Sequence, residues 1–124
     1  MAFRISDAAA SAALTALNTA IGTSATIKFY TGSQPATVDT SATGTLLGTL
    51  TASSTFGSVS GRTLTAGTIT EDSSADATGT AGYVRVFNGS TAVCDALVGA
   101  EVTMNSNAIV AGGPIQMSSF VITL

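Results

Sequence analysis

Hydrophobic and polar positions alternate over short runs through most of the chain. In residues 25–31 (ATIKFYT), the apolar residues Ala25, Ile27 and Phe29 alternate with Thr26 and Lys28. Runs rich in Thr, Val and Ile, separated by Gly, Ser, Asn and Asp, follow at 45–52, 61–70, 81–88, 91–98, 101–104 and 114–124. Such runs are typical of strands. We therefore predict an all-β fold, an antiparallel β-sandwich of the jelly-roll or Ig-like kind.

One segment has a helical pattern instead. Leu14, Leu17 and Ile21 recur at helical spacing within an Ala-rich stretch. Ser6 is a suitable N-cap and Gly22 a suitable stop. The pattern predicts one short N-terminal helix that packs on its own subunit, with packing on a neighbouring subunit as the alternative. Residues 1–22 then form an N-terminal arm and helix joined to a β-sandwich of residues 23–124, one domain overall.

The connecting segments carry turn signals. Asn88 and Gly89 both tolerate positive φ, which predicts a tight type I′ hairpin between the strands at 81–88 and 91–98. Asn88, Gly89 and Ser90 also form a glycosylation acceptor, but the turn explains them better. Residues 32–44 and 71–79 are longer loops, and residues 53–61 are predicted to be a flexible connector.

The loop at 71–79 contains Glu71, Asp72 and Asp76, three of the acidic residues in the chain. Calcium accepts oxygen ligands of this type in flexible loops. The spacing does not fit an EF-hand loop, so we expect a solvated connector rather than a metal site.

Candidate catalytic groups are scarce. The 124 residues contain no His, one Cys and only 9% charged residues, and the chain lacks phosphate-cradling, nucleophile-elbow and zinc-binding motifs. The absence of His excludes a Ser-His-Asp triad. Asp95 with Glu101 is a carboxylate pair of the type that glycoside hydrolysis uses, but a single pair is weak evidence. We expect a non-enzymatic protein without cofactor or metal.

The remaining chemistry-bearing residues also favour a structural role. The four cations, Arg4, Lys28, Arg62 and Arg85, are scattered in the sequence and the net charge is −3. They supply no basic stripe, so we expect no direct binding to nucleic acid. Cys94 lies in an apolar run and is predicted to be a buried, inert thiol. No run is long and apolar enough to predict a membrane span.

Three stretches carry a resemblance to a known group of proteins: IKFYTGSQPATVDTSATGTLLGTL (27–50), ADATGTAGYVRVFNG (75–89) and SNAIVAGGPIQMSSFVITL (106–124). With the N-terminal helix, they resemble small all-β structural proteins of tailed-bacteriophage virions. The resemblance implies a capsid decoration (cement) protein that bridges subunits of the major capsid protein. A neck or tail-tube subunit of the same virion is the alternative. A carbohydrate-binding module is disfavoured, since the chain has no Trp.

The first residues are the candidate partner-binding site. Ala2, Phe3, Arg4 and Ile5 place two apolar anchors beside a cation, which suits an arm that binds a neighbour. The alternative is a first strand on the chain's own sheet. The partners expected are the major capsid protein and further copies of this chain, with a trimer favoured over other homo-oligomers. We expect the protein on the capsid surface of the virion, and in the host cytoplasm during assembly.

Overall fold

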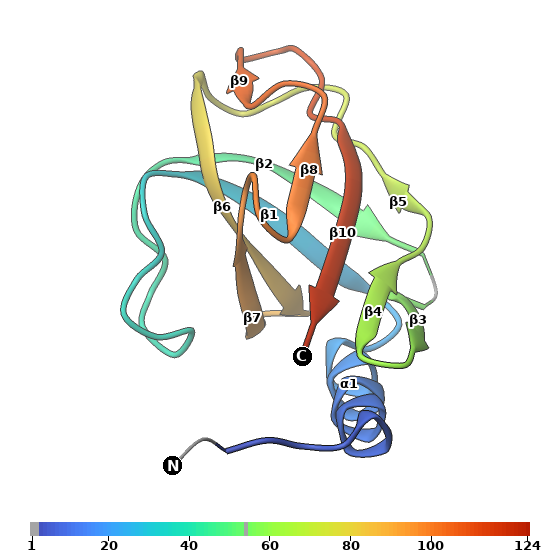
Figure 1. Ribbon diagram of the computed structural model, residues 1–124. Helices are drawn as coiled ribbons and strands as arrows, with labels where there is room; N and C mark the ends of the chain where they lie inside the picture. Colours follow the sequence, from blue (N-terminus) through green and yellow to red (C-terminus); the bar gives the residue numbers. More distant parts are fainter. Residues whose placement is uncertain (1–2, 54) are drawn as a thin grey trace.

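Two antiparallel sheets and one helix make up the fold, seen in a computed structural model that describes residues 3–53 and 55–124 (Figure 1). The helix is α1 (Asp7–Ile21). The strands are β1 (Ala25–Thr31), β2 (Leu46–Ala52), β3 (Gly57–Ser60), β4 (Thr63–Ala66), β5 (Ile69–Thr70), β6 (Gly79–Asn88), β7 (Thr91–Leu97), β8 (Val102–Met104), β9 (Ala108–Ile109) and β10 (Met117–Thr123). The predicted all-β sandwich with a single helix is confirmed.

The six-stranded sheet has the order β5-β2-β1-β6-β7, and β9 pairs with β6 outside this path. The four-stranded sheet has the order β3-β4-β10-β8. The long strands β1 and β6 form the centre of the larger sheet, with Ile27 opposite Val86 and Lys28 opposite Arg85. Strand β7 therefore lies at one border of that sheet, with β6 as its neighbour.

The alternation in β1 explains which side chains fill the core. Ala25, Ile27 and Phe29 are fully buried, as the sequence pattern predicts for one face of the strand. Phe56 and Phe120 meet edge to face with ring centroids 5.4 Å apart, and they join the same cluster. A single apolar core thus lies between the sheets.

Helix α1 closes the core at the end of the molecule that also holds the N-terminal segment (Figure 1). The hydroxyl of Ser6 accepts the N–H of Ala9 at 3.1 Å, and Gly22 adopts a φ of 83° at the C-terminal end. Leu14 and Ile21 are fully buried. The predicted helix, its cap and its packing on its own subunit are confirmed, because α1 contacts β3, β4 and β6.

The strand predictions were wrong in segments where small polar residues dominate. Residues 61–70, predicted as one strand, form β4 and β5, which belong to different sheets. The chain crosses between them at Gly67, whose N–H bonds to the carbonyl of Phe56 at 2.8 Å. Residues 53–61, predicted as a flexible connector, contain β3, and a methyl group at Gly57 would clash with the backbone of Thr65. Strand β9 was not predicted.

The hairpin between β6 and β7 is confirmed, but its turn is shifted by one residue. Asn88 pairs with Thr91, so the two central residues are Gly89 and Ser90. Gly89 has a φ of 63°, and among the described residues only glycines have positive φ. This is the pattern of a type II′ turn, not the type I′ turn predicted. Asn88 instead ends β6 and donates its side-chain N–H to the carbonyl of Ala20 at 3.1 Å.

The loop at 71–79 is tied to the sheet rather than simply solvated. The Asp72 carboxylate accepts the N–H groups of Thr49 and Ser74, each at 3.0 Å. Gly48 allows this approach, because a methyl group there would lie 2.5 Å from an oxygen of Asp72. Ala75 is buried. The loop therefore links β2 to the segment that precedes β10, where Ile115 donates its N–H to the carbonyl of Asp72 at 2.7 Å.

Candidate functional site

The N-terminal segment projects from the fold. Phe3 is 89% exposed, Arg4 is exposed and Ile5 is half-buried, and none of them belongs to a strand. The alternative that this segment forms a first strand on its own sheet is therefore wrong for residues 3–5. Ala2, the remaining predicted partner-binding residue, lies outside the described residues. An exposed Phe beside a cation is available for contact with another molecule.

Arg62 fixes the base of this segment to the last strand. Its Nη1 donates to the carbonyl of Ile5 and to Oδ1 of Asp7, each at 3.0 Å. Its Nε donates to the carbonyl of Leu124 at 2.7 Å, and Leu124 returns its N–H to the carbonyl of Arg62 at 3.0 Å. One guanidinium thus joins the N-terminal segment, the helix start and the C-terminal end of β10. The fork geometry of Arg suits such a three-way contact.

A second surface feature is a groove between β7 and β10, which we call the β7–β10 groove. It is a depression of about 460 Å³ lined by side chains of α1, β7 and β10 and of the turn between β7 and β8. These lining side chains include Leu17, Cys94, Val121 and Ile122, all of them only half-buried. An apolar groove with half-exposed walls is incompletely covered.

Asp95 and Glu101, the carboxylate pair noted in the sequence, both line the β7–β10 groove. Each carboxylate has a partner, however. Asp95 accepts the side-chain N–H of Gln34 at 3.0 Å and lies 3.4 Å from Arg85, whereas Glu101 accepts the backbone N–H of Leu97 at 3.1 Å. These contacts give both carboxylates structural roles in holding a loop and a strand edge.

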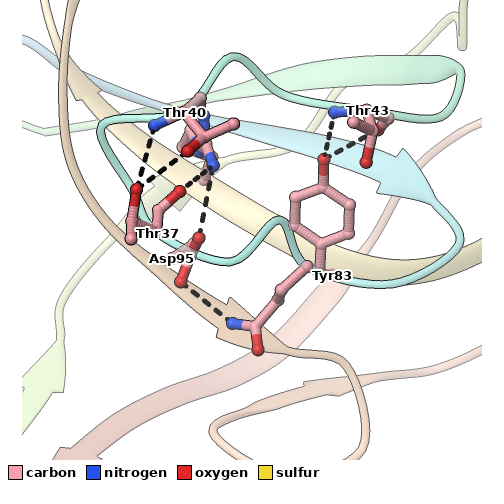
Figure 2. Close-up of polar contacts among 7 residues, drawn as sticks. Thr37, Thr40, Thr43, Tyr83 and Asp95 are labelled. Atoms are coloured by element: carbon pink, nitrogen blue, oxygen red, sulfur yellow. Dashed lines mark hydrogen bonds and ion pairs between the residues drawn. The ribbon is translucent and has the colours of Figure 1, made fainter.

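A polar cluster surrounds Arg85, which lies opposite Lys28 on the outer face of the larger sheet. Figure 2 labels Thr37, Thr40 and Asp95 of this cluster. The Arg85 side chain is buried, and its guanidinium donates to the carbonyl of Thr40 at 2.6 Å and lies 3.4 Å from the carbonyl of Thr37 and from Asp95. Gln34 adds a bond to the same carboxylate. The cluster holds the loop of residues 32–44 against the sheet. A buried charge of this kind requires such partners.

Two tyrosines extend this cluster. The hydroxyl of Tyr83 donates to the carbonyl of Thr43 at 2.7 Å and accepts the N–H of the same residue at 3.0 Å, as Figure 2 shows. Tyr30 stacks on Tyr83 with ring centroids 5.2 Å apart. Burial raises the pKa of Tyr30, and Tyr83 raises this pKa further while Arg85 opposes the shift. The loop therefore covers an aromatic face that would otherwise be solvated.

The cations do not gather into a basic surface in the described part of the chain. Lys28 lies 4.8 Å from the ring centre of Phe87, a cation–π contact. Arg85 is neutralised by Asp95, and Arg62 by Asp7. Arg4 is on the projecting segment. The absence of direct nucleic-acid binding stays a prediction.

Cys94 is half-buried in the β7–β10 groove. Burial, with a smaller effect from Asp95, raises the pKa of its thiol to about 11. The thiol is therefore protonated at neutral pH, but Cys94 is not fully buried as predicted, and its inertness stays a prediction. Within residues 3–53 and 55–124, no group of three His, Cys, Asp or Glu side chains is placed to hold a metal ion. No helix in the same residues is long and apolar enough to cross a membrane.

Sequence reasoning missed the roles of Arg62, Arg85 and Gln34. Each bonds to residues far away in the sequence. In several of these hydrogen bonds the two partners are 48 to 62 positions apart. No local pattern marks such contacts. Arg85 offered one signal only, a cation within an otherwise apolar strand, which calls for a buried partner.

Comparison with known proteins gave no match: no protein-family model, no curated protein and no solved structure is significantly similar to this chain.

Proposed function

We propose that this chain is a non-enzymatic structural protein of a tailed-bacteriophage virion, and specifically a capsid decoration protein that bridges major capsid protein subunits. The observation that carries the proposal is the projecting segment with an 89% exposed Phe3 whose base is fixed by Arg62. A β-sandwich that holds an apolar arm in a fixed direction is suited to docking on a repeated surface. The sequence resemblance supplies the class of partner.

The energy available per copy is modest, which suits a protein present in many copies. Burial of the Phe3 side chain against a capsid subunit would contribute about 2 kcal/mol. Main-chain hydrogen bonds from the arm to a strand edge would add to this. A symmetric shell repeats the contact many times, so a weak interface stabilises the whole particle.

The experiment is a binding assay with particles that lack this protein. Deletion of residues 1–5 or the Phe3→Asp substitution is expected to abolish binding, because each removes the apolar anchor. Val110→Asp is the matched control, since Val110 is 63% exposed but lies next to β9, at the end opposite α1 in Figure 1. Arm variants that bind as well as the unchanged chain would contradict the arm's role.

Cryo-electron microscopy of the same particles decides between the two virion positions. Density on the outer face of the head, at junctions between capsid subunits, supports decoration. Density confined to a ring at the portal or along the tail rejects decoration and supports the neck or tail subunit. Symmetry is the discriminating property, because trimeric sites belong to the shell and hexameric or twelvefold rings to the neck and tail.

A further inference from the structure

The β7–β10 groove lies between two strand borders that face each other. Strand β7 pairs with β6, and within the described residues no strand pairs with its other border. Strand β10 pairs with β8 at residues 117–120 and with β4 at residues 121–123, so its last residues have no strand on the β8 side. Free strand borders are templates for an added strand.

Both borders present main-chain groups to the groove. The N–H of Leu97 points away from β6, because it bonds to Oε1 of Glu101. The N–H of Val121 points away from β4, because it bonds to the carbonyl of Glu101. Main-chain groups alternate sides along a strand, so those of Asp95 and Thr123 point the same way as these two. The N–H groups of Leu97 and Val121 are already bonded to Glu101, so the main-chain groups that the groove offers to an added strand are those of Asp95 on one wall and Thr123 on the other.

We propose that the β7–β10 groove receives the N-terminal arm of a second copy of this chain as an added strand. This assignment rests on the arm's role as a docking segment, proposed above, but not on which particle the protein joins. In an extended strand, Phe3 and Ile5 share one face and Arg4 lies on the other. The two apolar side chains then pack on the floor formed by Leu17 and Ile122.

Charge complementarity favours this occupant. Asp95 and Glu101 are the charged residues that line the groove, and both are acidic. Arg4 is the charged residue of the arm, and it forms no ion pair among the described residues. Asp95 is paired with Arg85, so Glu101 carries the unpaired negative charge of the groove among the described residues, and Arg4 of the arm brings a cation to it.

The chain's own arm is a poorer occupant. Residues 3–5 line a different depression, with Arg62 and Leu124, and none of them lines the β7–β10 groove. The carbonyl of Ile5 is held by Arg62 at 3.0 Å, which keeps residues 3–5 at this other depression. A neighbouring copy can enter without breaking this contact.

The first test uses sedimentation of the full-length chain over a range of concentrations. The unchanged chain and the Val110→Asp control are expected to self-associate as concentration rises. Phe3→Asp is expected to remain a monomer at concentrations at least tenfold higher. Phe3 and Val110 are both exposed, so neither substitution disturbs the core. Equal self-association of all three chains would overturn the proposal.

The second test locates the contact by NMR on the full-length Phe3→Asp chain, with a peptide of residues 1–6 as the probe. The peptide is expected to shift the amide signals of Asp95, Ala96 and Thr123. A peptide carrying Phe3→Asp is expected to shift them at least tenfold less at the same concentration. Adding Thr123→Pro to the protein removes one groove-facing N–H and should weaken binding about fivefold.

Three results overturn the assignment. The first is a set of peptide-induced shifts confined to another surface, and the second is no shifts at all. The third is a difference in the groove signals between the unchanged chain and the Phe3→Asp chain when both are monomeric. That difference would mean that the arm of the unchanged chain fills its own groove. The particle-binding assay tests the virion role independently. If the arm is needed for binding to particles but the peptide does not bind the groove, the virion role is supported and the groove assignment is wrong. If the peptide binds the groove but the chain does not bind particles, only the virion role is wrong.

Discussion

The clearest physical signature of single residues lies where the loop of residues 32–44 meets the outer face of the larger sheet. Arg85 is 2% exposed, and its charge is matched by Asp95 and two loop carbonyls. Its Nε has no hydrogen-bond partner among the described residues. An incompletely satisfied buried charge is costly, so the cluster fixes the position of residues 32–44 more than it adds to stability.

Cys94 gives a pH dependence with a definite sign. Its thiol pKa is raised from its ordinary value near 9 to about 11 in the folded chain, mainly by burial. Between these values the unfolded chain loses the thiol proton while the folded chain keeps it, so the free energy of unfolding falls as pH rises. The loss should reach about 2–3 kcal/mol at the top of this window.

Urea unfolding at a series of pH values from neutral to alkaline measures this loss. The control is Cys94→Ala, which keeps the titrating tyrosines, including Tyr30 with its raised pKa. The slope of the free energy of unfolding against pH differs between the two chains, and this difference gives the contribution of the thiol. Parallel curves for the two chains would show that the thiol titrates alike in the folded and unfolded states.

At the scale of elements, the close approach of strand β6 to the loop that follows β1 depends on a glycine. Gly82 in β6 faces Gly32, and a methyl group at position 82 would overlap the carbonyl oxygen of Gly32. Gly82→Ala should lower the free energy of unfolding by about 3 kcal/mol, because backbone on both sides resists displacement. Gly67→Ala is the control, since its methyl group would make only an ordinary contact at 3.8 Å. Urea midpoints that move equally for the two variants would refute the clash.

Elements whose side chains alternate strictly were predictable from the sequence. Strand β1 was predicted with its bounds because Ala25, Ile27 and Phe29 report the buried face directly. Helix α1 was predictable because its cap and its apolar stripe are local signals. Local pattern therefore carries an element when burial on one face decides its conformation.

Elements set by distant partners were not predictable. Residues 61–70 look like one strand, yet they divide because Gly67 bonds to Phe56 and β5 pairs with β2. The hairpin turn moved by one residue because Asn88 is held in β6, bonded to the end of α1. The candidate site followed the same rule: the sequence identified Phe3, Arg4 and Ile5, but the anchor at Arg62 and the β7–β10 groove exist only in the folded chain.

At the scale of the whole molecule, the helix belongs to the same core as the sheets. Leu14 and Ile21 of α1 are fully buried in the cluster that contains Ile27 and Phe120. The division into residues 1–22 and 23–124 is therefore not a division into separately folding parts. The arm of residues 3–5 stands outside this core and contributes through surface contacts to Arg62.

This arrangement predicts a sharp difference between two truncations. Removal of residues 1–5 should leave the unfolding midpoint nearly unchanged, because it loses only the exposed arm and a contact to the half-exposed Arg62. Removal of residues 1–22 should prevent cooperative folding, because it uncovers the end of the core that Leu14 fills. Leu14→Ala in the full chain should cost about 3 kcal/mol. Circular dichroism and urea unfolding measure the stability of the two truncated chains and of Leu14→Ala. If the chain of residues 23–124 still unfolds cooperatively, the sandwich folds without α1 and this prediction is wrong.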